Sequence, residues 1–301
     1  MQKFIYLTIV PACIILVLMS IACVVEDRTH DTTEPTRDTT EPTYEPTQTA
    51  EPTRESETVT FPDKNLEAVI RDAINKPFGE ITTTELVRLT ELEATGNGIN
   101  NLIGLEYCIN LTTLIIWDDQ ISDISVLENL TNLTHLNLNS NQLTDISALE
   151  NLTNLTYLGL GSQLSDISAL EKLANLTHLK LIYNQISDIS ALENLTNLTY
   201  LNLIDNQISD ISVLENLTNL RDLHIRHNQI CDISALENLT NLSHLALDDN
   251  QISDISALVA NGGLGSGDFL NIFNNNLDLT EGSDDMKDIR ALVDRGVDVR
   301  Y

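Results

Sequence analysis

Residues 197–218 read NLTYLNLIDNQISDISVLENLT, and close copies of this stretch recur along most of the chain. The copies are 22 residues apart except for a single step of 21, as the leucines that mark each copy show: Leu92, Leu114, Leu136, Leu158, Leu179, Leu201, Leu223 and Leu245. A fixed period of this length indicates a repeat protein in which each unit packs against its neighbours. The repeat therefore decides the fold.

Each copy contains two hydrophobic patterns. Leu201 and Leu203 alternate with other residues, which predicts a short β-strand with both leucines on one face. Ile208, Ile211 and Leu214 then step by three, a spacing that suits a 3₁₀-like, turn-rich return. Because one coil cannot cover its own apolar face, the coils must stack. Stacking joins the strands into a parallel sheet over a continuous aliphatic core.

An asparagine follows the strand in most copies, and we expect its amide to hydrogen-bond buried backbone at the turn. This predicts a ladder of Asn141, Asn184, Asn206, Asn228, Asn250 and Asn275. Two copies depart from the pattern. Asp119 occupies the position in the first, and the copy that is one residue short has Gly161-Ser162-Gln163 without the asparagine. We expect a local kink or a weakened ladder at the short copy.

These copies are identified as leucine-rich repeats, and they resemble the 22-residue repeats of bacterial internalins, which are surface proteins. The resemblance covers about residues 58–301. It implies an α/β solenoid: a leucine-rich-repeat horseshoe with a concave parallel β-sheet, a 3₁₀ and turn-rich convex side, and a helical N-terminal cap, to which we add a C-terminal cap. It also implies that the concave sheet binds a protein ligand.

The sequence beside the repeats fits such caps. Phe61-Pro62-Asp63 leads into an amphipathic stretch that Pro77 ends, and Thr83 or Thr84 starts a second short helix. Ser283 begins a further helix, with Met286, Ile289, Leu292 and Val293 on one face, which Gly296 stops. We predict an N-terminal cap over 58–88, repeats over 89–260, and the last strand with the C-terminal cap over 261–301. The sheet should have about nine strands.

The first 57 residues differ from the rest. Residues 1–23 contain a long apolar run after Lys3 and resemble a signal sequence with a lipoprotein box at Cys23. Lipidation at Cys23, cleavage with release, and an uncleaved helical anchor all remain open. Residues 24–57 repeat Glu-Pro-Thr, which predicts a disordered linker. The protein is thus expected to be exported and to reside at the cell membrane or surface.

Charge and composition exclude several functions. The net charge of −29 argues against nucleic acid as a partner and against adsorption to anionic lipid, so contact with a membrane is expected only through the N-terminal anchor. Much of the acidity belongs to the Asp-Ile-Ser and Leu-Glu elements of the repeat, and a solvated outer face explains it. No catalytic, phosphate-binding or metal-binding motif occurs, so we expect no enzyme activity, no cofactor and no metal site. Cys108 is expected in the core.

Unusual residues concentrate on the strand positions that face away from the core. These positions hold five of the six histidines and the single tryptophan. Aromatic residues and arginine form most binding hot spots, so we predict a ligand face there. Its residues are Trp117, His135, Tyr157, His178, Ile182, Tyr183, Tyr200, His224, Arg226, His227, His244, Phe269 and Phe273.

The rings in this set should form a row, because the coil pitch repeats at ~4.8 Å and would set His135, Tyr157, His178 and Tyr200 side by side with flat apolar area. The acidity of the protein should raise the affinity of its histidines for protons, so binding should change between about pH 5.5 and 7.5. The sequence thus predicts a monomeric, surface-anchored binding module for a protein or other macromolecular ligand. The alternative is a structural or self-associating surface protein without a specific ligand.

Overall fold

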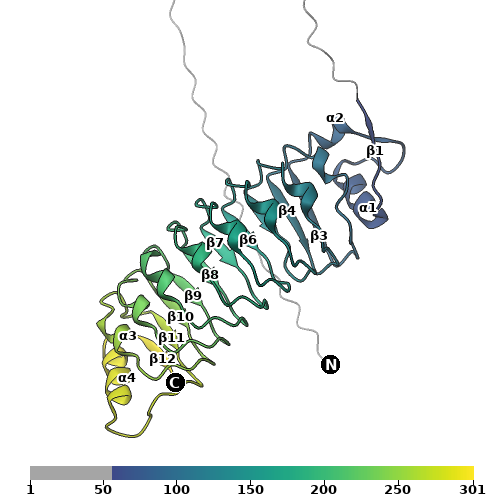
Figure 1. The fold of residues 1–301 in the computed structure, drawn as a ribbon. Helices are drawn as coiled ribbons and strands as arrows, with labels where there is room; N and C mark the ends of the chain where they lie inside the picture. Colours follow the sequence, from purple (N-terminus) through teal and green to yellow (C-terminus); the bar gives the residue numbers. More distant parts are fainter. Residues whose placement is uncertain (1–55) are drawn as a thin grey trace, which may run out of the picture. The chain divides into compact units, whose positions relative to one another are not determined.

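The computed structural model describes residues 56–301, which form a stack of coils with a helical cap at each end (Figure 1). The predicted signal sequence, Cys23 and almost all of the linker lie outside the described residues. Within residues 56–301, no helix is both long and apolar enough to span a membrane.

One parallel sheet of ten strands runs the length of this stack, with the strands in chain order. Leu201 pairs with Leu179 on one side and Leu223 on the other, so the leucine alignment gave the correct register. The strands are β3 (Glu91–Thr95), β4 (Thr113–Trp117), β5 (His135–Asn137), β6 (Tyr157–Gly159), β7 (His178–Lys180), β8 (Tyr200–Asn202), β9 (Asp222–His224), β10 (His244–Ala246), β11 (Phe269–Asn271) and β12 (Asp298–Arg300).

Short helical turns return the chain on the opposite, convex side. Leu201, Leu203, Ile208 and Leu214 are all fully buried, so each coil contributes to a single aliphatic core. The turns are η1 (Leu105–Tyr107), η2 (Ser125–Leu127), η3 (Ser147–Leu149), η4 (Ser168–Leu170), η5 (Ser190–Leu192), η6 (Ser212–Asn216) and η7 (Ser234–Leu236), and α3 (Ser256–Ala260) takes this place in the coil that follows β10.

The asparagine ladder forms as predicted. The Asn206 amide nitrogen donates to the carbonyls of Leu181 (2.8 Å) and Leu203 (3.0 Å), and its oxygen accepts from the Ile186 N–H (3.1 Å). One side chain thereby bonds to backbone groups of two consecutive coils. Those N–H and C=O groups would raise the free energy of the fold if they were buried without partners. Asn141, Asn184, Asn228, Asn250 and Asn275 make equivalent bonds.

The two irregular copies keep only part of this ladder. Asp119 accepts from the Ile99 N–H (2.9 Å), but its second carboxylate oxygen is buried without a partner, because an aspartate has no amide group to donate. In the short copy, the Ser162 hydroxyl accepts from the Leu143 N–H (2.9 Å) and replaces the acceptor half of the asparagine. The ladder is weakened there, yet the leucine register continues unbroken from β5 through β7.

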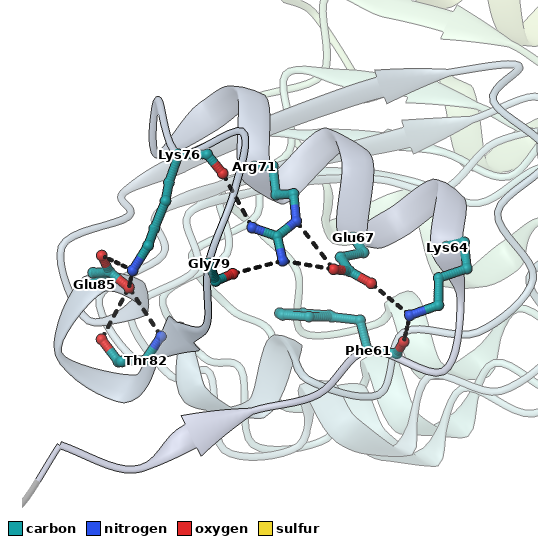
Figure 2. A network of polar contacts seen from close by, with 8 residues as sticks. All are labelled: Phe61, Lys64, Glu67, Arg71, Lys76, Gly79, Thr82 and Glu85. Atoms are coloured by element: carbon teal, nitrogen blue, oxygen red, sulfur yellow. Dashed lines mark hydrogen bonds and ion pairs between the residues drawn. The ribbon is translucent and has the colours of Figure 1, made fainter.

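A compact polar network holds the N-terminal cap together (Figure 2). This cap consists of β1 (Thr58–Val59), α1 (Lys64–Ala73), β2 (Ile81–Thr82) and α2 (Thr83–Leu86), with β1 antiparallel to β2. Arg71 pairs with Glu67 (2.8 Å) and also donates to the carbonyls of Lys76 (3.1 Å) and Gly79 (3.0 Å). One guanidinium group thus ties α1 to the loop that follows it. Helix α2 begins at Thr83, as expected.

The carboxylate of Asp63 joins this cap to the first repeat. One oxygen accepts from the N–H groups of Asn65 (2.8 Å) and Leu66 (3.1 Å) and so caps α1. The other accepts from the N–H groups of Asn100 (2.7 Å) and Asn101 (3.2 Å) in the first coil. Burial alone would raise the pKa of Asp63, but these four donors outweigh it and hold the pKa below its usual value.

Three details of the two ends differ from the sequence predictions. Helix α1 ends at Ala73, before Pro77, because Asn75 takes a left-handed backbone conformation (φ 53°). The sheet has a tenth strand, β12, which lacks the leucine pattern of the repeats and follows α4 (Asp284–Asp294). Val293 on α4 is exposed, whereas Ile289 and Leu292 are buried. Ser283 caps α4 through the Met286 N–H (3.1 Å), as predicted.

Truncating one core leucine should destabilise the stack strongly. We expect Leu201→Ala to lower the free energy of unfolding by about 2–5 kcal/mol, because it removes a fully buried side chain between two neighbouring leucines. Glu215→Ala, on the exposed convex side, should change it by less than about 0.5 kcal/mol. Denaturant melts of the two variants provide the measurement, and equal effects would contradict the assigned strand face.

Acid should weaken the junction between the cap and the repeats. Because the folded protein lowers the pKa of Asp63 below 3.8, the ionised carboxylate stabilises the fold above about pH 4, and this contribution disappears as the pH falls through the lowered value. We expect Asp63→Asn to lower stability by about 2 kcal/mol at pH 7. The difference from the unsubstituted protein should shrink as the pH falls below about 4 and the carboxylate becomes protonated. Thermal melts from pH 7 to pH 2 test this, and a constant difference would refute it.

Candidate functional site

The solvent-facing side of the ten-stranded sheet, which we call the concave face, carries a row of aromatic rings. Successive ring centroids are 4.6–6.3 Å apart, and four of the six neighbouring pairs are stacked, with interplanar angles of 12–27°. The guanidinium of Arg300 lies 4.8 Å from the centroid of the last ring. This aromatic row consists of His135, Tyr157, His178, Tyr200, His224, His244 and Phe269.

Strand pairing produces the row. The residue before each core leucine points to solvent, and pairing sets His135 beside Tyr157 and Tyr157 beside His178. Strand β9 has Asp222 at this position, and the row continues through His224, whose ring centroid lies 5.4 Å from that of Tyr200. The predicted row of His135, Tyr157, His178 and Tyr200 is therefore confirmed, and it extends further than the sequence indicated.

Stacking changes what the row can offer a ligand. Where neighbouring rings stack, each covers part of the face of the next, so the flat apolar area expected from the sequence is largely absent. The row offers a line of polar ring atoms, namely tyrosine hydroxyls and imidazole nitrogens. Some of them already have partners within the protein: Nδ1 of His135 and of His178 bond to the hydroxyls of the preceding threonines (2.9 and 3.0 Å), and the Tyr200 hydroxyl accepts from the Asn202 amide (3.2 Å). Such a line favours hydrogen bonding to a partner over the stacking of a planar or sugar ring.

Exposed apolar side chains lie along the end of the strands. Trp117, Tyr183 and Phe273 are 43%, 62% and 61% exposed. Ile182, which was expected to face solvent, is half-buried, and so is Ile204 at the equivalent position in the next coil. Trp117 belongs to β4 and Phe273 to the region after β11, so these residues do not gather into one patch.

A shallow hollow of about 270 Å³ lies on the concave face near the start of the aromatic row. It is lined by Thr113, Ile115, His135, Leu136, Asn137 and Tyr157. Larger hollows of about 460–490 Å³ occur on the convex side between successive turns, for example around Asp145, Glu150 and Lys172. Because the convex hollows recur with the repeat, they reflect its geometry and do not single out a site.

Cations occupy the middle of the concave face. The ammonium nitrogen of Lys180 is 5.5 Å from the ring centroids of both Tyr157 and Tyr200, a cation–π geometry that positions it between them. Arg226 lies two coils further along, and its Nε is buried without a hydrogen-bond partner. Lys180 was not predicted as a site residue, although its strand position was a signal that could have identified it.

The histidines do not behave as the overall acidity suggested. Burial, and then the nearby His244, lower the pKa of His224, so the expectation that its affinity for protons is raised is wrong for this residue. At the end of the coil, His227 Nε2 lies 3.2 Å from a carboxylate oxygen of Asp249. In the described part of the chain, no three His, Cys, Asp or Glu side chains are grouped closely enough to hold a metal ion.

The acids of the convex side have a structural role that the sequence analysis missed. Asp210 accepts a hydrogen bond from the Ser212 N–H (2.8 Å) at the start of the next helical turn, and the bond recurs at Asp123, Asp145, Asp166, Asp188, Asp232 and Asp254. These bonds lower the pKa of each of these aspartates. The two-residue spacing of Asp-Ile-Ser is the signal for this turn cap.

Comparison with known proteins agrees with this fold. The leucine-rich-repeat family profile (two copies) matches residues 131–172, 174–216 and 218–260. Internalin C2 of Listeria monocytogenes is 37% identical, with a TM-score of 0.66 over 72% of this chain and 94% of its own. The protein therefore belongs to the internalin-like leucine-rich-repeat family. No significant match was found among curated protein sequences.

Two plant receptors are also similar in structure. RGFR1, a plant peptide hormone receptor solved in complex with RGF2, is 27% identical with a TM-score of 0.52, and the match covers 65% of this chain and 34% of the receptor. The ectodomain of the Arabidopsis thaliana receptor kinase GASSHO1/SCHENGEN3 is 24% identical with a TM-score of 0.57, over 70% of this chain and 26% of the receptor structure. The second comparison concerns the fold alone.

Proposed function

We propose that this protein is a binding module, not an enzyme, and that it holds a protein or other macromolecular ligand on its concave face. The aromatic row is the observation that carries the proposal. Its positions point away from the core, so the packing of the leucines does not require a ring at any of them. Stacking already holds these tyrosine and histidine rings in place, so a ligand that bonds to their polar atoms would bind at a low cost in side-chain conformational entropy.

The similarity to RGFR1 supports this proposal, because that receptor was solved with RGF2 bound and shares the solenoid architecture. The remaining site residues are proposed to contribute to the same face. They are Trp117, Ile182, Tyr183, Arg226, His227 and Phe273. The alternative is a self-associating surface protein, and the exposed side chains of Trp117 and Phe273 are the feature that favours it.

A display selection on the full chain can test the binding face while the natural ligand is still unidentified. A random-peptide library would be selected on the unsubstituted protein, and the enriched binders measured against variants. We expect Tyr157→Ala, Tyr200→Ala and Trp117→Ala each to weaken binding by more than about 1 kcal/mol, and at least one by about 2 kcal/mol. Glu150→Ala and Glu193→Ala on the convex side are the matched controls and should have little effect.

The opposite pattern, with loss of binding only in the convex variants, would refute the proposed face. Sedimentation velocity distinguishes the binding module from the alternative, a self-associating surface protein. A stable oligomer that Trp117→Ala dissociates would favour self-association, whereas a monomer that binds selected peptides supports the binding module.

We further propose that the protein is exported and anchored by lipid at Cys23. The apolar run after Lys3 and the sequence Ser20-Ile21-Ala22-Cys23 support this, because together they resemble a signal sequence ending in a lipoprotein box. A lipid chain would hold the repeats at the membrane surface, where the concave face can meet its partner.

Metabolic labelling tests the anchor. Bacteria that express the full chain with radiolabelled palmitate should label the unsubstituted protein and leave Cys23→Ala unlabelled. Cys13→Ala is a matched control, because Cys13 lies inside the apolar run and should not affect labelling. Equal labelling of the unsubstituted protein and Cys23→Ala, or no labelling of either, would refute lipidation. Recovery of the protein in the cytosol would refute export.

A further inference from the structure

Two cations at the centre of the concave face lack a direct ion pair. Within residues 56–301, neither Lys180 nor Arg226 forms an ion pair within 4.0 Å, although the protein carries a net charge of −29. Asp248, at the equivalent position in the next coil, attracts Arg226 only from beyond 4.0 Å, and one of its oxygens is buried without any hydrogen-bond partner. In so acidic a protein, cations left unpaired at the middle of one face indicate that negative charge from outside pairs with them.

A strained aromatic residue follows Lys180 in the same coil. Tyr183 has a left-handed backbone (φ 56°), and its side chain is 62% exposed. Other coils place Asp118, Ser140, Asp205, His227, Asp249 and Asn274 in this conformation. Mostly short polar residues, which tolerate it best, occupy the position, so a bulky tyrosine raises the free energy of the fold. Because its ring is exposed and buries little apolar area, the stability of the fold does not explain why a tyrosine occupies this position.

We propose that the ligand of the concave face is an extended, acidic polypeptide segment, with carboxylates four residues apart that pair with Lys180 and Arg226 and, between them on the same face, an apolar side chain that packs on Tyr183. This inference rests on the proposed function and specifies the chemistry of the partner. The half-buried Ile182 and Ile204 continue the apolar contact beside Tyr183.

The geometry sets the spacing of the carboxylates. Lys180 ends β7 and Arg226 follows β9, so one strand, β8, lies between their coils. Two strand spacings amount to roughly 10 Å, and Arg226 also lies two residues beyond His224, the register partner of Lys180, so the two positions are roughly 12 Å apart. Four residues of an extended chain span roughly 13 Å and bring the side chains at both ends to the same face. A segment that runs along the array can therefore place one carboxylate near each cation. A block of adjacent acids cannot match both positions as well.

Three synthetic peptides would test this on the full chain by fluorescence polarisation. The first repeats Glu-Ser-Val-Ser four times, the second replaces every Glu with Gln, and the third has the composition of the first with its four Glu residues adjacent, so that no two of them are four residues apart. We expect the first to bind roughly tenfold more tightly than the second and severalfold more tightly than the third. Its affinity should fall as the salt concentration rises from about 0.05 M to about 0.3 M.

Variants of the protein identify the contacts. Lys180→Glu and Arg226→Glu should each weaken binding of the first peptide roughly tenfold. Lys172→Glu, a charge reversal of the same kind on the convex side, is the matched control and should leave binding unchanged. Tyr183→Asn should raise the melting temperature, because asparagine tolerates the left-handed backbone, and should still weaken binding. A loss of binding through misfolding would instead lower the melting temperature.

Equal binding of the Glu and Gln peptides, or no effect of either concave charge reversal, would overturn the inference. The display selection on the full chain keeps this failure separate from a failure of the proposed function. Selected binders that lose affinity with Tyr157→Ala but carry no excess of acidic residues would support the concave face as the binding face and refute the acidic partner. Binders that map to the convex side would refute both.

Discussion

The structure depends on a constraint that every coil shares: a single coil has too little apolar surface to form a core, so it is stable only between two neighbours. Leu201 illustrates this, because it is fully buried between Leu179 and Leu223 and belongs to the interior only through them. The asparagine ladder imposes the same dependence on polar groups, since Asn206 satisfies backbone atoms of its own coil and of the one before. Both interactions work only if the coils remain in register.

That constraint explains why the ends of the array differ from its middle. The first coil has no preceding coil to satisfy its backbone, and the carboxylate of Asp63 supplies acceptors for Asn100 and Asn101. At the other end, β12 pairs with β11, and α4 precedes it. Capping elements of this kind are what a stack of coils needs in order to end in solvent.

The same register also builds the candidate site. Because pairing aligns equivalent positions of successive strands, the outward-facing residue of one strand lies beside the outward-facing residues of the two adjacent strands. Tyr157 and Tyr200 flank Lys180 for this reason, and the row passes from Tyr200 to His224 when Asp222 occupies the expected position. The core fixes the scaffold, and the outward positions remain free to vary. This division makes the concave face suited to recognition while the leucines preserve the fold.

The sequence by itself determined the repeat, the strand register, the asparagine ladder and the positions that face outward, because each follows from a fixed spacing along the chain. It could not reveal contacts that depend on side-chain conformation or on distant segments. The stacking of the rings, the pairing of β12 with β11, and the cap that each Asp-Ile-Ser aspartate forms were decided by the tertiary structure. The lowered pKa of His224 belongs to the same group, since burial between coils outweighs the acidity that the composition suggests.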